Sequence, residues 1–271
     1  MKLALKDRGP TLISRQTKPE GQEMILTFDT IPSTNTYAKE HIGELEDGAL
    51  VAAWEQTAGR GRFDRKWISP PNVNIYASFV MKKITDPFLA TASASLAVLE
   101  LLKTAFPEGD FFIKWPNDIY AGECKICGVL SERVIHSDPE KSGVIAGMGI
   151  NVNMTEEDLA AAGQPASSLY ILSGRKFNLE KSLSQLAEML SRCYINYILS
   201  AQNSFQEWKK HNFVLGKEIE IGDAFSHAER VFVEDIDENG LLVCRYGNGE
   251  VKKLSAGDVR ILKEWLKLKN D

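Results

Sequence analysis

Apolar positions along the chain follow helical spacing in two long segments. Between residues 88 and 106 they recur every three to four positions, behind Asp86 as a capping residue and Pro87 in the first turn. A second stripe follows Asn178, another residue type that caps helices. The stripes consist of Phe88, Ala92, Leu96, Leu99, Leu102 and Phe106, then Leu183, Leu186, Leu190, Tyr194 and Tyr197. The spacing predicts two long helices, each with one buried face.

Short apolar runs bounded by turn residues alternate with these helices. They predict strands over 24–28, 50–54, 74–80, 111–115, 128–135 and 142–147, with Ser33 capping a short helix that runs through residue 38. From about residue 214 the pattern changes to short strands at 217–221, 229–236, 241–246 and 250–254. We therefore expect an α+β protein with three parts. These are a polar N-terminal arm (1–23), a larger mixed domain (24–212) and a small β-barrel or sandwich (213–271).

One segment, residues 55–67, combines glycines with positive charge. Arg60, Arg62, Arg65 and Lys66 are set among Gly59 and Gly61, and Trp67 closes the run. Glycines let backbone N–H groups converge on an anion, and arginines add planar donors that match phosphate or carboxylate oxygens. For the segment alone, a solvated basic turn is the favoured interpretation. The segment becomes a candidate anion site only together with other motifs.

Four further motifs accompany this segment in a fixed order. Ser33-Thr34-Asn35 precedes it, and Lys114-Trp115-Pro116-Asn117-Asp118, Lys125-Ile126-Cys127-Gly128 and Gly147-Met148-Gly149-Ile150-Asn151 follow. With Gln56 and the Arg60-Gly61-Arg62 run, the chain resembles the biotin–protein ligases over about residues 24–265. The resemblance implies a synthetase-like mixed β-sheet catalytic domain flanked by helices, followed by a small SH3-like β-barrel.

The resemblance also implies roles for individual residues. Ser33, Thr34, Asn35 and Gln56 would bind the ureido ring of biotin, and Arg60, Gly61, Arg62 and Lys125 its carboxylate and the adenylate phosphate. Gly59, Arg65, Trp67, Lys114, Trp115, Asn117 and Asn151 would contribute to ATP binding with Arg62 and Lys125, and Asp118 would help to place Mg²⁺. Lys125 and Arg62 are the expected catalytic residues. Without the resemblance, helix capping is the simpler interpretation of Ser33.

The implied activity is biotin–[biotin carboxyl-carrier protein] ligation. Biotin and MgATP would form biotinyl-5′-AMP, and a lysine of the acceptor domain of a biotin-dependent carboxylase would then take up the biotin. Because only a short arm precedes residue 24, we expect a form of the family without an N-terminal DNA-binding domain. Alternatives are a lipoate or octanoate ligase of related fold, and a sensor that binds biotin or a nucleotide without transfer.

Composition and charge argue against several other classes of protein. A net charge of −5 argues against general nucleic-acid binding. No run of about 18 apolar residues predicts a membrane span, and no signal-peptide pattern is found, so we expect a cytoplasmic location. Cys124 and Cys127 lack the second ligand pair of a zinc site, and we interpret them as incidental. The sequence leaves open whether the chain forms a homodimer.

The sequence departs from the family pattern at one place in the basic segment. The family pattern reads Arg-x-Gly-Arg, whereas this chain reads Arg62-Phe63-Asp64-Arg65, so that Asp64 stands in place of the glycine. Aspartate tolerates positive φ less well than glycine does. We therefore expect altered closure of the segment and a changed affinity for the adenylate.

Overall fold

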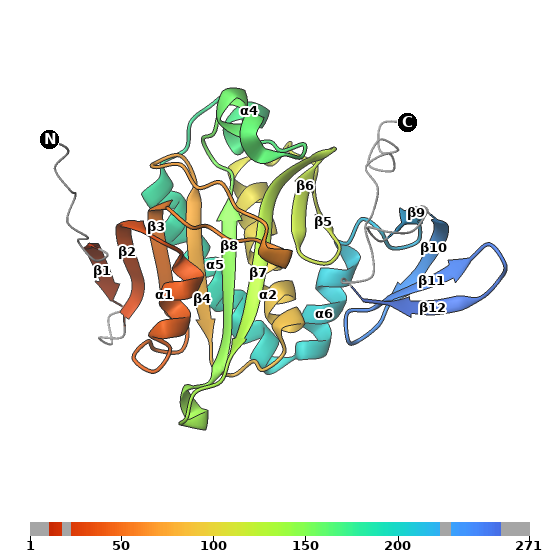
Figure 1. Cartoon of the computed structure of the whole chain (residues 1–271), viewed down its shortest axis with the longest axis horizontal. Coiled ribbons are helices and arrows are strands. Elements are labelled where there is room, and N and C mark those ends of the chain that lie inside the picture. The colour runs from red at the N-terminus through yellow and green to blue at the C-terminus, as the bar shows by residue number, and fades with distance from the viewer. Residues whose placement is uncertain (1–10, 18–22, 223–228, 256–271) are drawn as a thin grey trace, which may run out of the picture.

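The computed structural model describes residues 11–17, 23–222 and 229–255, and its central feature is an eight-stranded mixed sheet (Figure 1). The strand order is β1-β2-β3-β4-β8-β7-β6-β5, with β2 and β3 parallel and all other neighbours antiparallel. The strands are β1 (Leu12–Thr17), β2 (Glu23–Ile31), β3 (Leu50–Gln56), β4 (Ile75–Met81), β5 (Phe111–Lys114), β6 (Asp118–Ala121), β7 (Cys124–Val134) and β8 (Gly143–Ile150).

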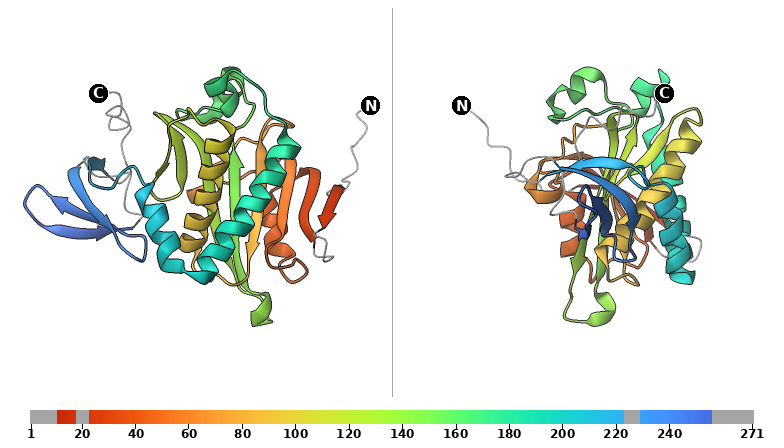
Figure 2. Two further views of the ribbon diagram at one scale, coloured as in Figure 1. Left: turned by 180° about the vertical axis from the view of Figure 1, so that it is seen from behind. Right: turned by 90° about the vertical axis from the view of Figure 1, so that its right-hand side faces the viewer.

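Helices cover the two faces of this sheet unequally. The short α1 (Thr34–Glu40) lies on one face, whereas α2 (Pro87–Ala105) and α5 (Leu179–Leu199) cover the other, with α6 (Ala201–Lys210) beside them (Figure 2). Asp86 caps α2, Asn178 caps α5 and Ser33 caps α1, as the sequence predicts. The remaining helical segments are α3 (Glu156–Leu159), α4 (Leu169–Ser173) and short 3-10 turns at Arg62–Asp64, Pro139–Lys141 and Ala160–Ala162.

The alternation of side chains along β8 separates the two faces. Val144, Ala146 and Met148 belong to the large core that includes α2 and α5, whereas Ile145 belongs to the smaller core beneath α1. Because successive strand residues point to opposite faces, Gly147 and Gly149 lie on the same face as Ile145. That face is only partly covered by a helix, and it is where the candidate site lies.

Helix α2 is the core helix of the protein. By length and composition it is apolar enough to cross a membrane, but 61% of its most apolar window is buried inside the protein. Nearly all of its residues from Ala90 to Leu102 are buried against the sheet and its neighbouring helices.

A second, four-stranded antiparallel sheet follows α6, in the order β12-β11-β10-β9. Its strands are β9 (Glu218–Ile221), β10 (Glu229–Ile236), β11 (Leu242–Tyr246) and β12 (Val251–Leu254), close to the predicted positions and consistent with an SH3-like domain. Its apolar residues, such as Ile219 and Leu242, join the same hydrophobic cluster as the large sheet. The domain boundary near residue 213 therefore stays a prediction.

Three elements differ from the sequence-based expectation. Residues 12–17, expected to be part of a loose arm, form β1 at the edge of the large sheet; the rest of residues 1–23, apart from Thr11 and Glu23, lies outside the described residues. Strand β6, which follows the Trp115-Pro116 break, was not predicted. Helix α6, which carries the fully buried Trp208, was not predicted either.

Candidate functional site

A polar network connects α1 with the end of β3 and the middle of β4. Gln56 Oε1 accepts hydrogen bonds from the backbone N–H of Thr34 at 2.9 Å and from its hydroxyl at 3.2 Å. The buried Ser78 hydroxyl lies 2.7 Å from Thr34 Oγ1 and 2.6 Å from Asn35 Oδ1. The structure thus brings Thr34, Asn35 and Gln56 together, with Ser33 at the helix cap. Ser78 was missed in the sequence, because a lone serine in an apolar strand carries no motif.

Glycines in β7 and β8 make room for the side chains above them. A Cβ atom at Gly147 would lie 1.9 Å from Asn35 Oδ1, and one at Gly149 would lie 2.3 Å from Trp67 Nε1. Gly128 is the register partner of Gly149, and a Cβ there would lie 3.1 Å from the Trp67 ring. The Gly147-Met148-Gly149 motif is therefore a shallow floor on which Asn35 and Trp67 rest.

The basic segment folds back on itself above this floor. Gly61 N–H donates to Arg65 O at 2.7 Å, and Trp67 N–H donates to Gly59 O at 2.9 Å. Gly59 fits tightly, because a Cβ there would lie 2.5 Å from Trp67 O. The positive φ of this segment falls on Phe63 (φ 54°) and not on Asp64, the position that the family pattern singles out. The residue with positive φ thus lies one place before Asp64.

Two cations of the site approach one acidic residue. Lys125 Nζ lies 2.7 Å from Asp118 Oδ1 and 5.2 Å from the centre of the Trp67 ring. Arg62 donates to Asn117 Oδ1 at 3.2 Å, which ties the basic segment to the turn between β5 and β6. Burial lowers the pKa of Arg62, as does the charge of Arg65, whereas the charge of Asp118 opposes the shift. Two partly desolvated cations beside a single carboxylate leave excess positive charge to meet an anion.

Several expected ligands are committed to contacts within the protein. Trp115 is 4% exposed, and its indole N–H donates to Gly240 O at 2.9 Å, in the turn between β10 and β11. Trp115 thus joins the two sheets, and its contribution to ATP binding stays a prediction. Asn151 is equally buried, and its amide donates to Ser167 O at 3.0 Å. It holds the segment 165–167 beside Lys125, so these contacts do not support a direct role at a nucleotide.

The other expected residues lie at the edge of the site. Arg60 pairs with Glu132 at 3.1 Å, and Arg65 is exposed on the basic segment. Lys114 Nζ lies 3.3 Å from Tyr120 Oη and over its ring. Within the described residues no group of three or more His, Cys, Asp and Glu side chains is arranged to hold a metal ion. Cys127 is buried, which raises the pKa of its thiol strongly and leaves it unreactive.

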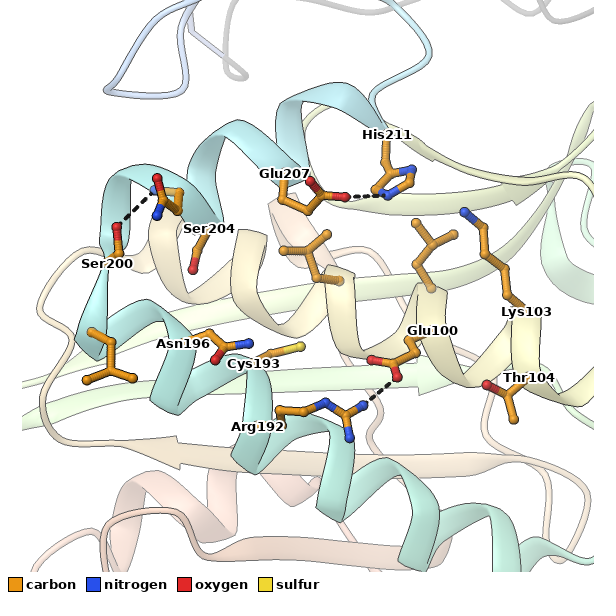
Figure 3. A pocket seen from close by; sticks show the side chains of 14 residues that line it. Glu100, Lys103, Thr104, Arg192, Cys193, Asn196, Ser200, Ser204, Glu207 and His211 are labelled. Atoms are coloured by element: carbon orange, nitrogen blue, oxygen red, sulfur yellow. Dashed lines mark hydrogen bonds and ion pairs between the residues drawn. The ribbon is translucent and has the colours of Figure 1, made fainter.

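A separate groove of about 800 Å³ lies on the helical layer, between α2, α5 and α6 (Figure 3). An ion pair between Glu100 and Arg192 and a contact of 3.2 Å between Glu207 Oε1 and His211 Nε2 bridge parts of its wall. Burial lowers the pKa of His211, as does the charge of Lys103, although Glu207 opposes the shift. The groove contains none of the motif residues, because it lies across the sheet from them.

Fold and site together define a small-molecule enzyme site. The polar side chains around Thr34, Asn35 and Gln56, called the ring pocket below, adjoin a cation cluster formed by Arg62 and Lys125. Residues 27–151 match the biotin/lipoate A/B protein ligase family. The chain is 30% identical over 223 residues to the biotin--[acetyl-CoA-carboxylase] ligase of Paracoccus denitrificans, covering 79% of this chain and 90% of that protein. The chain belongs to this family.

Two further relatives extend the comparison. The bifunctional ligase/repressor BirA of Salmonella typhimurium is 33% identical over 144 residues, which span 51% of this chain but only 44% of that protein. The solved structure of the Aquifex aeolicus biotin protein ligase in complex with biotin and ATP superposes with a TM-score of 0.72 at 25% identity, covering 88% of this chain and 98% of that one. The mixed sheet and the second small sheet are thus those of biotin protein ligases.

Proposed function

We propose that the protein is a biotin–protein ligase, which joins biotin to a lysine of an acceptor domain through biotinyl-5′-AMP. The observation that carries the proposal is the spacing on β8: Asn35 rests on Gly147 and Trp67 on Gly149, two residues further along the same face. Two strand residues span about 7 Å. The polar ring pocket and the cation cluster are therefore close enough to serve the two ends of one small acid.

The ring pocket suits a ureido group. A ureido ring presents one carbonyl acceptor and two N–H donors, and hydroxyl and amide side chains complement both kinds of group. Thr34, Ser33 and Gln56 supply such groups beside the network that Ser78 and Asn35 hold in place. A linear acyl chain would instead require an apolar slot at this position.

The cation cluster suits the first step, formation of the adenylate. One oxygen of the biotin carboxylate attacks the α-phosphorus of ATP, the bond to the β-phosphate oxygen breaks, and pyrophosphate leaves. Lys125 and Arg62 offset the repulsion between the two anions and stabilise the charge that develops on the α-phosphate. Asp118 holds Lys125 in position without neutralising Arg62 as well.

In the second step the amine of an acceptor lysine attacks the carbonyl carbon of the mixed anhydride. An amide bond forms, AMP leaves with the electrons of the broken C–O bond, and the amine loses a proton. Trp67 and the folded basic segment, which lie over the same floor, are placed to keep water away from the adenylate. The expected acceptor is the carboxyl-carrier domain of a biotin-dependent carboxylase.

Magnesium fits this site as a companion of the nucleotide. Mg²⁺ in such sites usually binds one or two carboxylates together with substrate phosphates. Asp118 offers one carboxylate beside Lys125, and it is the residue that would hold the ion. Bound there, Mg²⁺ would neutralise phosphate charge.

The related lipoate-ligase function is the second candidate, because the same family contains both activities by its description. Pyrophosphate release with MgATP separates them, with biotin, lipoate and octanoate offered in parallel samples. Of the three acids, we expect only biotin to cause pyrophosphate release. Gln56→Ala should reduce this release at least tenfold, because it removes the group that accepts hydrogen bonds from Thr34. Equal release with lipoate would contradict the assignment of the ring pocket.

A further inference from the structure

Glu132 on β7 collects contacts from both halves of the site. Its Oε2 accepts from Asn35 Nδ2 at 2.9 Å and from Arg60 at 3.1 Å, and its Oε1 lies 2.7 Å from Lys39 Nζ. Asn35 and Lys39 belong to α1, whereas Arg60 belongs to the basic segment. One carboxylate thus connects the ring pocket to the segment that covers the cation cluster.

The strand register explains how Glu132 reaches both. Gly128, Leu130 and Glu132 lie on one face of β7, opposite Gly149, Gly147 and Ile145 of β8. Glu132 is therefore two residue pairs beyond the glycine floor, beneath the end of α1. Its side chain is 23% exposed, so its contacts are screened less than those of a surface carboxylate.

The amide of Asn35 depends on this carboxylate for its orientation. Its Nδ2 group has two protons, which go to Glu132 Oε2 and to Leu130 O at 3.1 Å, while its Oδ1 accepts from Ser78. Without an acceptor at 132, one of these protons would lack a partner and the amide could turn. Glu132 thus determines which atoms of α1 face the ring pocket.

We propose that Glu132 is a positioning residue: it orients Asn35 in the ring pocket and, through Arg60, anchors the basic segment over the glycine floor. Arg60 then acts as the anchor of the segment, and Arg62 and Lys125 meet the anion. The effect on biotin rests on the proposed function, whereas the anchoring of the segment does not.

Limited trypsin digestion of the ligand-free full chain tests the anchor directly. The basic segment contains four trypsin sites, Arg60, Arg62, Arg65 and Lys66, and mass spectrometry can count cleavage at the last three, which every variant keeps. We expect Glu132→Gln to increase cleavage in this segment roughly tenfold, because the neutral amide loses a charge-assisted bond to Arg60. Glu234→Gln is the matched control, since Glu234 is similarly covered and pairs with Arg245 on the second sheet.

A double-mutant comparison tests whether Glu132 acts through Arg60. Arg60→Met should raise cleavage as Glu132→Gln does, and the double variant should exceed neither single variant by more than about twofold. Cleavage in Glu132→Gln equal to that of the wild type, with the fold intact by circular dichroism, would overturn the anchor. Multiplied effects in the double variant would overturn it as well.

Steady-state kinetics test the effect on the ring pocket. We expect Glu132→Met, which leaves no acceptor for Asn35 at position 132, to raise KM for biotin roughly tenfold with kcat changed less than threefold, a split that simple loss of folded protein would not produce. An unchanged KM would overturn the positioning of Asn35. If the wild type neither binds biotin nor releases pyrophosphate, the proposed function fails, and the digestion result still decides the anchor.

Discussion

Asn35 and Gly147 are mutually dependent: the side-chain oxygen of Asn35 occupies the place where a Cβ of residue 147 would be, 1.9 Å away. Asn35 is buried and its amide is fully engaged, with Ser78, Leu130 and Glu132 as partners. The position of the ring pocket therefore depends on a missing side chain in the neighbouring strand. This explains in physical terms why a glycine belongs at position 147.

We predict that Gly147→Ala disrupts the ring pocket and leaves the cation cluster in place. The new methyl group must displace Asn35, which breaks its bonds to Ser78 and Glu132. Biotin affinity, measured by isothermal titration calorimetry, should fall at least tenfold. Gly247→Ala is the control, because a Cβ at Gly247 would meet nothing within 4 Å. Unchanged biotin affinity in Gly147→Ala would contradict the location of the pocket.

Gly149→Ala should act on the nucleotide side of the same face. A Cβ there would lie 2.3 Å from Trp67 Nε1, so the indole must leave the floor and take the end of the basic segment with it. We expect KM for ATP to rise at least tenfold in the pyrophosphate-release assay, with biotin affinity reduced less than threefold. The reverse pattern would mean that Trp67 serves the ring pocket.

Lys125→Met tests the charge at the reaction centre. The methionine keeps the apolar stem over Trp67 and removes the charge beside Asp118. Adenylate formation should slow by roughly 10²- to 10³-fold, the usual cost of losing one donor to a developing charge. Lys252→Met, at an exposed ion pair on the second sheet, is the control and should change the rate less than twofold. A similar small effect at Lys125 would remove it from the catalytic residues.

Trp115→Phe should destabilise the protein through the contact between the two sheets. The indole N–H donates to Gly240 O in a buried site, and phenylalanine leaves that carbonyl without this donor. We expect the free energy of unfolding to fall by about 1–3 kcal/mol from this bond alone, measured by urea denaturation. Trp208→Phe is a useful comparison, because the Trp208 indole N–H has no hydrogen-bond partner within the described residues. A smaller loss at Trp115 than at Trp208 would contradict this prediction.

The carboxylate of Glu132 should contribute to stability in a pH-dependent manner. Burial acts to raise its pKa, but hydrogen bonds from Lys39 and Asn35 and the charges of Lys39 and Arg60 outweigh burial, so its pKa is lowered. A lowered pKa in the folded state means that the contribution is present above the unfolded-state pKa and is lost as the pH falls through the folded-state pKa. The difference in unfolding free energy between wild type and Glu132→Gln should therefore shrink in acid. A difference that grows in acid would contradict the sign.

Much of the fold follows from local patterns in the sequence. The caps at Ser33, Asp86 and Asn178 mark the starts of α1, α2 and α5, because a side-chain oxygen satisfies free N–H groups at each of these positions. The four strands of the second sheet are separated by clear turns. Strand β1 was missed because a polar edge strand has no apolar alternation, and its stability comes from pairing with β2.

The sequence predicts which residues gather at the site better than it predicts what each of them contacts. Ordered motifs identified Lys125, Arg62 and Thr34, which the structure brings to one face of the sheet. The commitment of Trp115 to Gly240, 125 residues away, depends on how two sheets pack, and no local pattern reports that. Ser78 and Glu132 could not be predicted as site residues for the same reason, because strand register decides which residues they contact. The effect of Asp64 on closure of the basic segment stays a prediction, and the positive φ of the segment lies at Phe63.

Intact-mass spectrometry of a purified biotin acceptor domain, incubated with this protein, biotin and MgATP, tests the proposed ligase activity most directly. We predict a single biotinyl addition to the acceptor that requires ATP, is absent with lipoate, and disappears when the acceptor lysine is replaced by arginine. An unmodified acceptor together with no pyrophosphate release would contradict the ligase assignment. Modification by lipoate with equal efficiency would instead assign the protein to the other activity of its family.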